Sequence, residues 1–349
     1  MIKTIGILGG GQLGRMLSMA AARLGIRVHI YEPQSQPPAG DVATRVFTAG
    51  YDDVNALRAF AKSVDIVTFE FENIPAAALD IVEAITPVLP RRNALEVSQD
   101  RITEKHFLQA QSAAVAPFVQ VDTLADLQAA LGVVGTPAIL KTRRFGYDGK
   151  GQVRITALDQ AEEAFASLAG APAVLEQMIP FEREISIIAA RNANGEVACF
   201  DPGENVHKEG ILHTTTVPAS ISHALQTDAV LLAARILNAL DYVGIMGVEL
   251  FVTSDGLMVN EIAPRVHNSG HWTQDACLID QFEQHIRAIA GWPLGDGQRH
   301  SDAEMTNLIG DDVNQLEEWH NSAIHLYGKV EVKSGRKMGH VNNISPISA

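Results

Sequence analysis

Two glutamates, Glu249 and Glu261, stand out because their spacing could bring two carboxylates together. The stretch 249–261 has two arms of strand-forming residues around a Ser-Asp-Gly turn, which predicts a β-hairpin. If the turn centres on Asp255, the two glutamates lie opposite each other with Cβ atoms about 5 Å apart. Such carboxylates repel unless a cation lies between them, and beside the neutral Asn260 they suit Mg²⁺ that arrives with substrate phosphates. The alternative is a shifted register that turns one glutamate to solvent.

The polar loop 263–271 follows this hairpin directly and has no apolar periodicity. It contains a fixed cation, Arg265, two imidazoles, His267 and His271, and the amide of Asn268. Next to a metal site, such a loop could bind an oxyanion and orient a small acid. A solvated connection is the alternative interpretation.

Two further strands end in residues that suit a nucleotide. The apolar strand 138–141 ends in Lys141, and the loop 145–152 that follows contains three glycines and a lysine, as expected of a mobile lid over phosphates. The strand 174–179 ends in polar residues before a proline, a form that suits gripping a planar base through backbone groups. Glu184 follows on the next strand, where its carboxylate could accept ribose hydroxyls.

A glycine-rich turn lies near the start of the chain. Gly9, Gly11 and Gly14 form a G-x-G-x-x-G pattern between a strand and a helix, where backbone N–H groups could hold a phosphate. Glu32 lies 21 residues after Gly11, where a dinucleotide-binding fold places its ribose-binding acid. Taken alone, this pattern favours NAD, but many α/β enzymes use the same turn for other phosphorylated ligands.

The elements that must position these residues divide into two patterns. The first ninety residues alternate strand and helix, which predicts an open parallel sheet that ends near 87–93. The short strands that follow are separated by turns and predict antiparallel pairing. Predicted strands cover 5–8, 28–31, 66–69, 138–141, 152–155, 173–177, 184–190 and two segments within 323–340; predicted helices cover 13–24, 54–61, 100–111, 123–132, 221–240 and 274–290.

Composition excludes several classes of protein. The 349 residues carry 27 Lys and Arg against 41 Asp and Glu, a formal net charge of −14, so a broad electrostatic grip on nucleic acid or anionic lipid is not expected. Two cysteines, Cys199 and Cys277, are too few for a disulfide framework and fit a reducing compartment. The start of the chain is neither a signal peptide nor a membrane span, so we expect a cytoplasmic protein.

Five short motifs stand in a fixed order along the chain: GGGQLGRM at 9–16, FEFENIP at 69–75, FGYDGKGQ at 145–152, RVHNSGHWT at 265–273 and GRKMGH at 335–340. With the paired-glutamate hairpin, this ordered set resembles the ATP-grasp superfamily and, more closely, the N5-carboxyaminoimidazole ribonucleotide synthetase family. The resemblance covers essentially the whole chain. One departure is Lys-Ser-Gly-Arg at 333–336, where many family members have Arg-Pro-Gly-Arg.

The resemblance implies an α/β and α+β protein with an ATP-grasp fold. It implies a Rossmann-like pre-ATP-grasp domain at 1–97 with a parallel sheet, an ATP-grasp domain at 98–295 with a lid subdomain at about 117–178, and a small β-rich C-terminal domain at 296–349. It also implies a homodimer.

The resemblance further implies roles for individual residues. The ATP site would comprise Arg101, Lys105, Lys141, Gly146, Tyr147, Asp148, Gly149, Lys150, Gly151, Gln152, Glu176, Gln177, Met178, Ile179, Glu184, His207, Asn260 and Glu261, with Glu249 and Glu261 as the Mg²⁺ or Mn²⁺ ligands. Bicarbonate would bind at Arg265, His267 and Asn268. The nucleotide substrate would contact Gly10, Gly11, Gln12, Leu13, Glu72, Tyr147, Asp148, Lys329 and Arg336. Catalytic roles are implied for Lys141, Asp148, Arg265, His267 and Asn268.

The implied activity is the ATP- and bicarbonate-dependent carboxylation of 5-aminoimidazole ribonucleotide (AIR) in purine biosynthesis. Bicarbonate would attack the γ-phosphoryl group of ATP to give carboxyphosphate, and the exocyclic amine of AIR would capture the carboxyl group. Asp148 or His267 would accept the amine proton, and the sequence does not decide between them. Three alternatives are an NAD-dependent oxidoreductase, a non-catalytic nucleotide sensor, and another ATP-grasp enzyme such as a formate-dependent glycinamide ribonucleotide transformylase.

Overall fold

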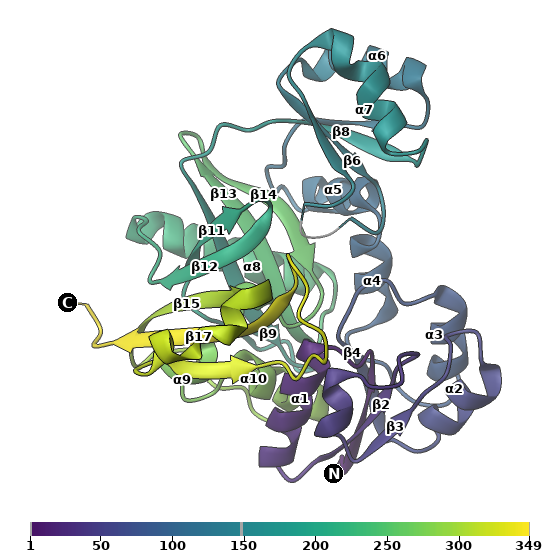
Figure 1. Ribbon diagram of the computed structural model, residues 1–349, viewed down its shortest axis with the longest axis vertical. Helices are drawn as coiled ribbons and strands as arrows, with labels where there is room; N and C mark the ends of the chain where they lie inside the picture. The colour runs from purple at the N-terminus through teal and green to yellow at the C-terminus, as the bar shows by residue number, and fades with distance from the viewer. Residues whose placement is uncertain (1, 147–148, 349) are drawn as a thin grey trace.

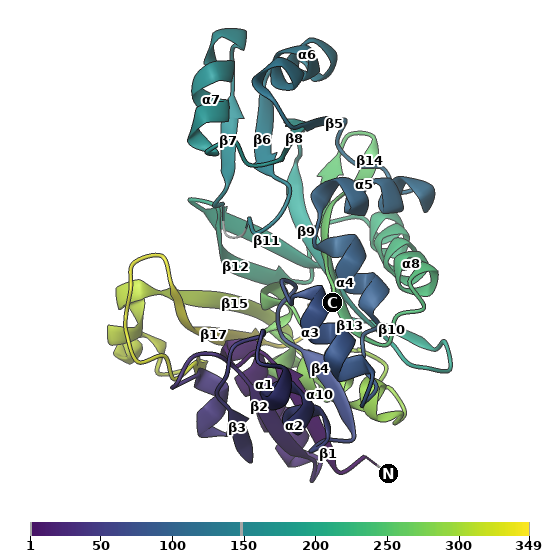
Figure 2. The same ribbon diagram turned by 90° about the vertical axis from the view of Figure 1, so that its right-hand side faces the viewer.

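Three β-sheets organise the part of the chain that the computed structural model describes, residues 2–146 and 149–348 (Figure 1). A four-stranded parallel sheet comes first in the chain, a four-stranded antiparallel sheet follows it and forms a separate lobe, and a nine-stranded sheet comes last. Figure 2 shows the lobe with β6, β7 and β8 standing away from the N-terminal sheet, on the far side of the nine-stranded sheet. No helix among the described residues is long and apolar enough to cross a membrane.

The N-terminal sheet confirms the predicted alternation of strand and helix. Its order is β3-β2-β1-β4, with all neighbours parallel. The β1 residues Ile5, Ile7 and Leu8 are fully buried because helices cover both faces of the sheet. The elements are β1 (Thr4–Leu8), α1 (Gln12–Arg23), β2 (Arg27–Tyr31), η1 (Pro38–Asp41), β3 (Arg45–Phe47), α2 (Val54–Ala61), β4 (Ile66–Phe69) and α3 (Ala76–Glu83).

Two helices, α4 (Arg92–Ser98) and α5 (Arg101–Ala110), lead from this sheet into the lobe. All strand pairs of the lobe are antiparallel, in the order β5-β8-β6-β7, as predicted. Thr123 and Asp126 form a capping box at the start of α6. The helix runs past Gly132, its predicted end, and is closed by Gly135, with φ +80°. The elements are β5 (Phe118–Val121), α6 (Leu124–Val134), β6 (Ala138–Thr142), β7 (Gln152–Ile155), η2 (Leu158–Gln160), α7 (Ala161–Ser167) and β8 (Ala173–Gln177).

The large sheet has the order β14-β13-β9-β11-β12-β15-β17-β16, with β10 paired to β9. The C-terminal strands therefore continue the sheet that carries the glutamate hairpin, because β12 pairs with β15. The strands are β9 (Arg183–Arg191), β10 (Val197–Cys199), β11 (Gly203–Lys208), β12 (Ile211–Val217), β13 (Gly244–Thr253), β14 (Gly256–Ala263), β15 (Asp302–Ile309), β16 (Ala323–Leu326) and β17 (Lys337–Ser345), with η4 (Gly310–Asn314) and η5 (Leu316–Trp319) between β15 and β16.

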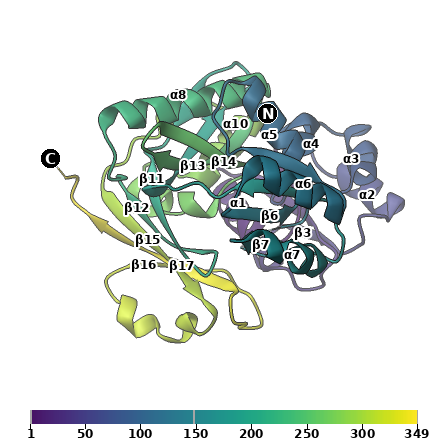
Figure 3. The same ribbon diagram turned by 90° about the horizontal axis from the view of Figure 1, so that it is seen from above.

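Two helices pack on this sheet, and one of them differs from the prediction. Helix α8 (His223–Ala239) packs against β9 and β14 of this sheet (Figure 3) and buries Ala229, Leu232 and Ile236. The single helix predicted over 274–290 is wrong: α9 (Thr273–Ala276) ends before Cys277, Leu278 is 86% exposed, and α10 (Gln281–Ala290) begins anew. The break occurs because the side chain of Asp280 accepts hydrogen bonds from the N–H groups of Phe282 and Glu283 as an N-cap.

A buried histidine on α10 joins the N-terminal sheet to the large sheet. His285 Nδ1 accepts a hydrogen bond from the N–H of Ile245 on β13, at 3.1 Å. Its other ring nitrogen lies 2.8 Å from Thr68 Oγ1 on β4. Since His285 is fully buried and burial lowers its pKa to about 3, it makes this connection as a neutral ring. The two thiols, Cys199 and Cys277, are free.

Candidate active site

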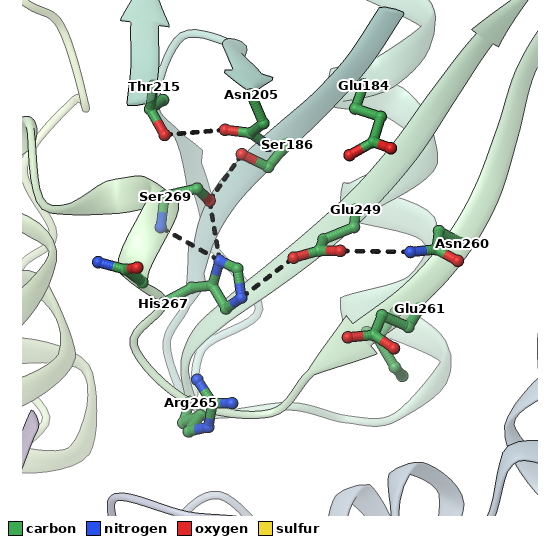
Figure 4. Close-up of polar contacts among 12 residues, drawn as sticks. Glu184, Ser186, Asn205, Thr215, Glu249, Asn260, Glu261, Arg265, His267 and Ser269 are labelled. Carbon is green, nitrogen blue, oxygen red and sulfur yellow. Dashed lines mark hydrogen bonds and ion pairs between the residues drawn. The ribbon is translucent and has the colours of Figure 1, made fainter. Parts of the chain in front are cut away.

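The paired glutamates face each other as predicted, but through a different turn. Glu249 on β13 is the register partner of Glu261 on β14. The hairpin closes at the pair Thr253 and Gly256, so a regular ladder would place Asn260 opposite Glu249. An irregularity beside Glu249 leaves Asn260 as the extra residue of a β-bulge, which brings Glu261 into line. Figure 4 shows both carboxylates on the same side of the sheet.

Each glutamate has a different set of neighbours. Arg101 on α5 donates to Glu261 Oε2 at 2.8 Å, whereas Glu249 lies 3.3 Å from Asn260 Nδ2 and 3.3 Å from His267 Nε2. Burial and the charge of Glu261 raise the pKa of Glu249 to about 7. Burial alone would raise the pKa of Glu261 also, but Arg101 lowers it to about 2. Glu249 is therefore the member of the pair whose charged form lacks a compensating cation.

The polar loop after β14 lies against this pair, so it is not a solvated connection. His267 is held with its ring beside Glu249, and burial, together with the charge of Arg265, lowers its pKa to about 3. Arg265 pairs with Glu72 of the N-terminal domain at 2.5 Å. Asn268, in η3 (Asn268–Gly270), exchanges amide hydrogen bonds with Asn307 of β15 at 2.9 and 2.8 Å. Arg265 and His267 are thus close enough for the charge of Arg265 to act on His267, whereas the Asn268 amide is paired with Asn307.

Two lysines, one on α5 and one on a strand of the lobe, contact the same buried carboxylate. Lys105 of α5 and Lys141 of β6 lie 3.2 and 3.1 Å from Glu176 Oε2 on β8. The Lys105 and Glu176 side chains are 1% and 5% exposed. Burial lowers the pKa of Lys105. Burial would raise the pKa of Glu176, but the charges of the two lysines outweigh this effect and lower it. Because two cations face one carboxylate, the cluster carries a net positive charge, which favours the binding of a polyphosphate.

The glycine loop begins at β6 and returns to β7. Lys141 is the register partner of Gln152, and Gly151 accepts a hydrogen bond from the N–H of Thr142 at 2.8 Å. Gly149 and Gly151 have φ of +75° and +70°, and a Cβ at Gly151 would lie 2.6 Å from Thr142 Oγ1, so both positions require glycine. Gly146 and Lys150 lie in the same loop. Tyr147 and Asp148, for which we predicted substrate and catalytic roles, lie outside the described residues.

The segment predicted to hold a base is partly committed to other contacts. The N–H groups of Gln177 and Met178 donate to the carbonyl groups of Pro117 and Pro137, so these two N–H groups are not available to a base. The ribose candidate Glu184 on β9 lies 2.5 Å from His207 Nδ1 on β11. Although burial opposes it, this carboxylate raises the pKa of His207. Glu184, Glu249 and Asn260 line one small depression.

A second cavity, of about 460 Å³, lies at the glycine-rich turn. Two cations from the C-terminal segment, Lys329 and Arg336, face the turn across it. The predicted contacts Gly10, Gly11 and Gln12 line this cavity, but Leu13 does not, because its side chain is buried in the core. The remaining lining residues are Glu32, Pro33, Gln34, Pro37, Pro38, Tyr51, Glu70 and Phe71.

The N–H groups of the turn are already occupied by internal carboxylates. Gly11 and Gly14 donate to Glu70, and Gly10 donates to Glu32 at 2.9 Å. In this structure the amides of Gly10, Gly11 and Gly14 therefore bond to carboxylates, and Glu32 bonds to the turn that it was expected to complement. This arrangement gives no support to the NAD alternative.

Glu70 is the site residue that sequence reasoning missed. It is buried, and burial raises its pKa. Its position one residue after β4, at the carboxyl edge of the parallel sheet, was a usable signal, since ligands of such sheets bind at that edge. The nearby Glu72, which we predicted to contact ribose, does not line the cavity and pairs with Arg265 instead.

Comparison with known families matches almost the whole chain. An ATP-grasp domain matches residues 106–282, a ribonucleotide synthetase preATP-grasp domain matches residues 2–99, and a phosphoribosylaminoimidazole carboxylase C-terminal domain matches residues 303–348. The fold and the site therefore define an ATP-grasp ligase.

Two curated relatives and two solved structures narrow the assignment. An N5-carboxyaminoimidazole ribonucleotide synthase of Brucella melitensis is 56% identical over 98% of this chain and 96% of its own, and one of Bacillus subtilis is 43% identical over 97% and 90%. The chain belongs to the N5-carboxyaminoimidazole ribonucleotide synthase family. An ADP complex of such a synthetase has a TM-score of 0.95 at 40% identity, covering 98% of this chain and 92% of that one. The Aspergillus clavatus enzyme with ADP and AIR has a TM-score of 0.92 at 32% identity, covering 99% and 94%.

Proposed function

We propose that this chain carboxylates AIR to N5-carboxyaminoimidazole ribonucleotide with ATP and bicarbonate, releasing ADP and phosphate. The observation that carries the proposal is the proximity of three groups: the glutamate pair, the polar loop after β14, and the two lysines at Glu176. The charges of Lys141 and His267 both act on Glu261 and help to lower its pKa. An enzyme that joins a phosphoryl donor to a small oxyanion needs these groups together.

The donor set fits Mg²⁺ or Mn²⁺ brought in with ATP. Glu249 and Glu261 supply hard carboxylate oxygens, and among the described residues no group of three or more His, Cys, Asp or Glu side chains could hold a metal ion. Two protein carboxylates and substrate phosphates are the ligands that Mg²⁺ commonly uses in phosphoryl-transfer enzymes. When bound, the metal would neutralise charge on the transferring phosphoryl group.

The residues around the pair would align the first step, in which a bicarbonate oxygen attacks the γ-phosphorus of ATP and the bond to the β-phosphate oxygen breaks. Arg101, Lys105, Lys141 and Lys150 would hold the phosphates, with the loop 146–152 above them. Arg265, His267 and Asn268 would hold bicarbonate. Because the attacking and transferring groups are both anionic, neutralisation by these cations supplies most of the rate enhancement.

The cavity at the glycine-rich turn would bind AIR. Lys329 and Arg336 would hold the AIR phosphate, because the N–H groups of Gly10 and Gly11 are bonded to carboxylates. Glu72 is bonded to Arg265 of the proposed bicarbonate site. The amine of AIR then attacks the carboxyl carbon of carboxyphosphate, or of CO₂ released from it. Phosphate leaves, and the amine loses a proton.

The test is ADP release measured with AIR and bicarbonate each omitted in turn. We expect full turnover only with both substrates, and label from ¹³C-bicarbonate in the nucleotide product. ADP release that needs formate in place of bicarbonate would instead support a formate-dependent transformylase. We also expect a homodimer, which the family resemblance implies, and a cytoplasmic location, which the cysteine content fits; light scattering of the purified protein tests the first.

A further inference from the structure

Two buried serines lie directly behind His267. Ser186, on β9, is 1% exposed, and Ser269, in the loop after β14, is fully buried. Ser186 is the register partner of Glu249, so it lies on the face of the sheet that carries the glutamate pair. Figure 4 shows the line that results: Ser186, Ser269, the His267 ring and Glu249.

The hydrogen bonds along this line have a direction. Ser186 Oγ donates to Ser269 Oγ at 2.7 Å, which leaves the hydroxyl hydrogen of Ser269 for His267 Nδ1, 2.8 Å away. The backbone N–H of Ser269 also donates to Nδ1, at 3.4 Å. Because Nδ1 accepts from both donors, the ring proton is on Nε2.

The other ring nitrogen faces the site. His267 Nε2 lies 3.3 Å from Glu249 Oε1, and a carboxylate oxygen accepts the hydrogen that this tautomer carries. The main chain of His267 is fixed as well, because Gln281 Oε1 accepts from its N–H at 2.9 Å and Gln281 Nε2 donates to its carbonyl at 2.7 Å. Gln281 is fully buried, so neither the backbone nor the ring of His267 is free to turn.

We infer that Ser269 and Ser186 are positioning residues that hold His267 with its proton on Nε2. His267 then gives a hydrogen bond to the oxyanion at the reacting centre and does not take the amine proton of AIR. The inference rests on the proposed function, and it removes one of the two candidates for the proton acceptor. Partners that fix the tautomer of a functional histidine commonly change activity when they are removed.

The first test is nitrogen NMR of the protein labelled with ¹⁵N-histidine, with the His267 signals identified by their loss in His267→Gln. We expect a protonated Nε2 and an unprotonated Nδ1 in the native protein, and a gain of protonated Nδ1 in Ser269→Ala. A native protein with its proton on Nδ1, or a Ser269→Ala spectrum identical to the native one, would overturn the inference. This readout needs no substrate, so it stands even if AIR carboxylation is not observed.

The second test is kinetic. We expect Ser269→Ala to lower kcat about tenfold, with little change in KM for ATP. Ser186→Ala should lower kcat about threefold, which is half that effect on a logarithmic scale. The double variant should be no slower than Ser269→Ala alone, because both serines act through one ring nitrogen. If the reduction in kcat of the double variant equals the product of the two single reductions, the serines act independently, which would contradict the inference.

A matched control removes a buried hydroxyl elsewhere. Thr86 Oγ1 donates to the carbonyl of Ala61 at 2.6 Å within the N-terminal domain, and Thr86→Val should leave kcat and the His267 spectrum unchanged. If Ser269→Ala misfolds, Ser186→Ala alone still tests the inference, because Ser269 then keeps its hydroxyl but loses its donor. A Ser186→Ala protein with native spectrum and native kcat would overturn it.

Discussion

Glu249 and Glu261 are cross-strand partners because Asn260 is an extra residue in β14. On one side of Asn260 the hairpin pairs Leu250 with Val259, and on the other it pairs Glu249 with Glu261. The bulge thus places two carboxylates opposite each other and leaves the Asn260 amide beside them, 3.3 Å from Glu249. Bulges occur next to active sites because they redirect single side chains in this way.

Glu249→Gln should lower ATP turnover about a hundredfold or more, because a neutral amide cannot help to neutralise charge at the metal and phosphoryl group. The fold should be retained, with the free energy of unfolding within about 1 kcal/mol of the native value, since like-charge repulsion with Glu261 is lost. ADP release and urea unfolding measure the two effects. Native turnover in this variant would remove the metal assignment.

Glu261→Gln should differ from Glu249→Gln in stability. Its carboxylate is the partner of Arg101, whose side chain is 18% exposed, so the variant leaves a poorly hydrated cation without its charge partner. We expect a loss of about 1–2 kcal/mol rather than the 3–5 kcal/mol of a fully buried pair, because the Glu261 side chain is 36% exposed. Equal stability of the two glutamine variants in urea would contradict this difference.

Glu176→Gln should be the more damaging change in the lysine cluster. It leaves Lys105 and Lys141 facing each other without a carboxylate, and we expect a stability loss of about 3 kcal/mol or more. Lys105→Met keeps the Lys141 to Glu176 pair and should cost less stability, but should raise the dissociation constant for ATP about tenfold. Calorimetric titration with ATP and thermal unfolding separate the two roles, and an unchanged ATP affinity in Lys105→Met would argue against phosphate contact.

Arg336→Ala should raise KM for AIR about tenfold, with KM for ATP little changed, because its cation lines the cavity at the glycine-rich turn. Lys329→Ala should behave similarly. Lys333→Ala is the control: this lysine pairs with Glu331 in the same segment, and its side chain is 63% exposed. Equal effects of all three substitutions on KM for AIR would mean that only the general charge of the segment matters.

The free energy of unfolding should fall as the pH rises from about 4.5 to about 8, because Glu104 keeps its proton in the folded state over this range. This residue is 2% exposed and accepts the N–H of Ile262 at 2.8 Å, and burial raises its pKa to about 8 from an ordinary value of 4.5. The folded state therefore holds a proton that the unfolded chain has lost, so stability present below pH 4.5 is lost progressively up to about pH 8.

Glu104→Gln tests this dependence, because the amide oxygen still accepts from Ile262 but cannot ionise. Each pH unit in the range can cost at most about 1.4 kcal/mol. Unfolding in urea at pH 5 and pH 8 should show a smaller fall in the variant than in the native protein. An identical fall in both would assign the dependence to other groups.

Local features of this protein could be predicted from sequence wherever neighbouring residues determine them. The parallel start and the facing glutamates were both predicted and are confirmed. The predicted helix over 274–290 failed because apolar periodicity suggested one helix, whereas Asp280 caps a new one and Leu278 turns to solvent. Periodicity alone does not reveal such a competing hydrogen bond.

The contacts that complete the sites could not be predicted, because they join residues far apart in the chain. Glu70 bonds to Gly11 from 59 residues away, Ser186 to Ser269 from 83, and Arg101 to Glu261 from 160. Sequence pattern gave residues of the right chemistry near each site, but which carboxylate meets which donor depends on how the sheets and helices pack.

The most direct test of the central claim is a crystal of the native protein grown with ADP and Mn²⁺, with anomalous scattering recorded at the manganese edge. The account predicts a manganese peak within ligand distance of both Glu249 and Glu261, with Arg101 turned away from Glu261. A single ordered manganese that contacts neither carboxylate would contradict it.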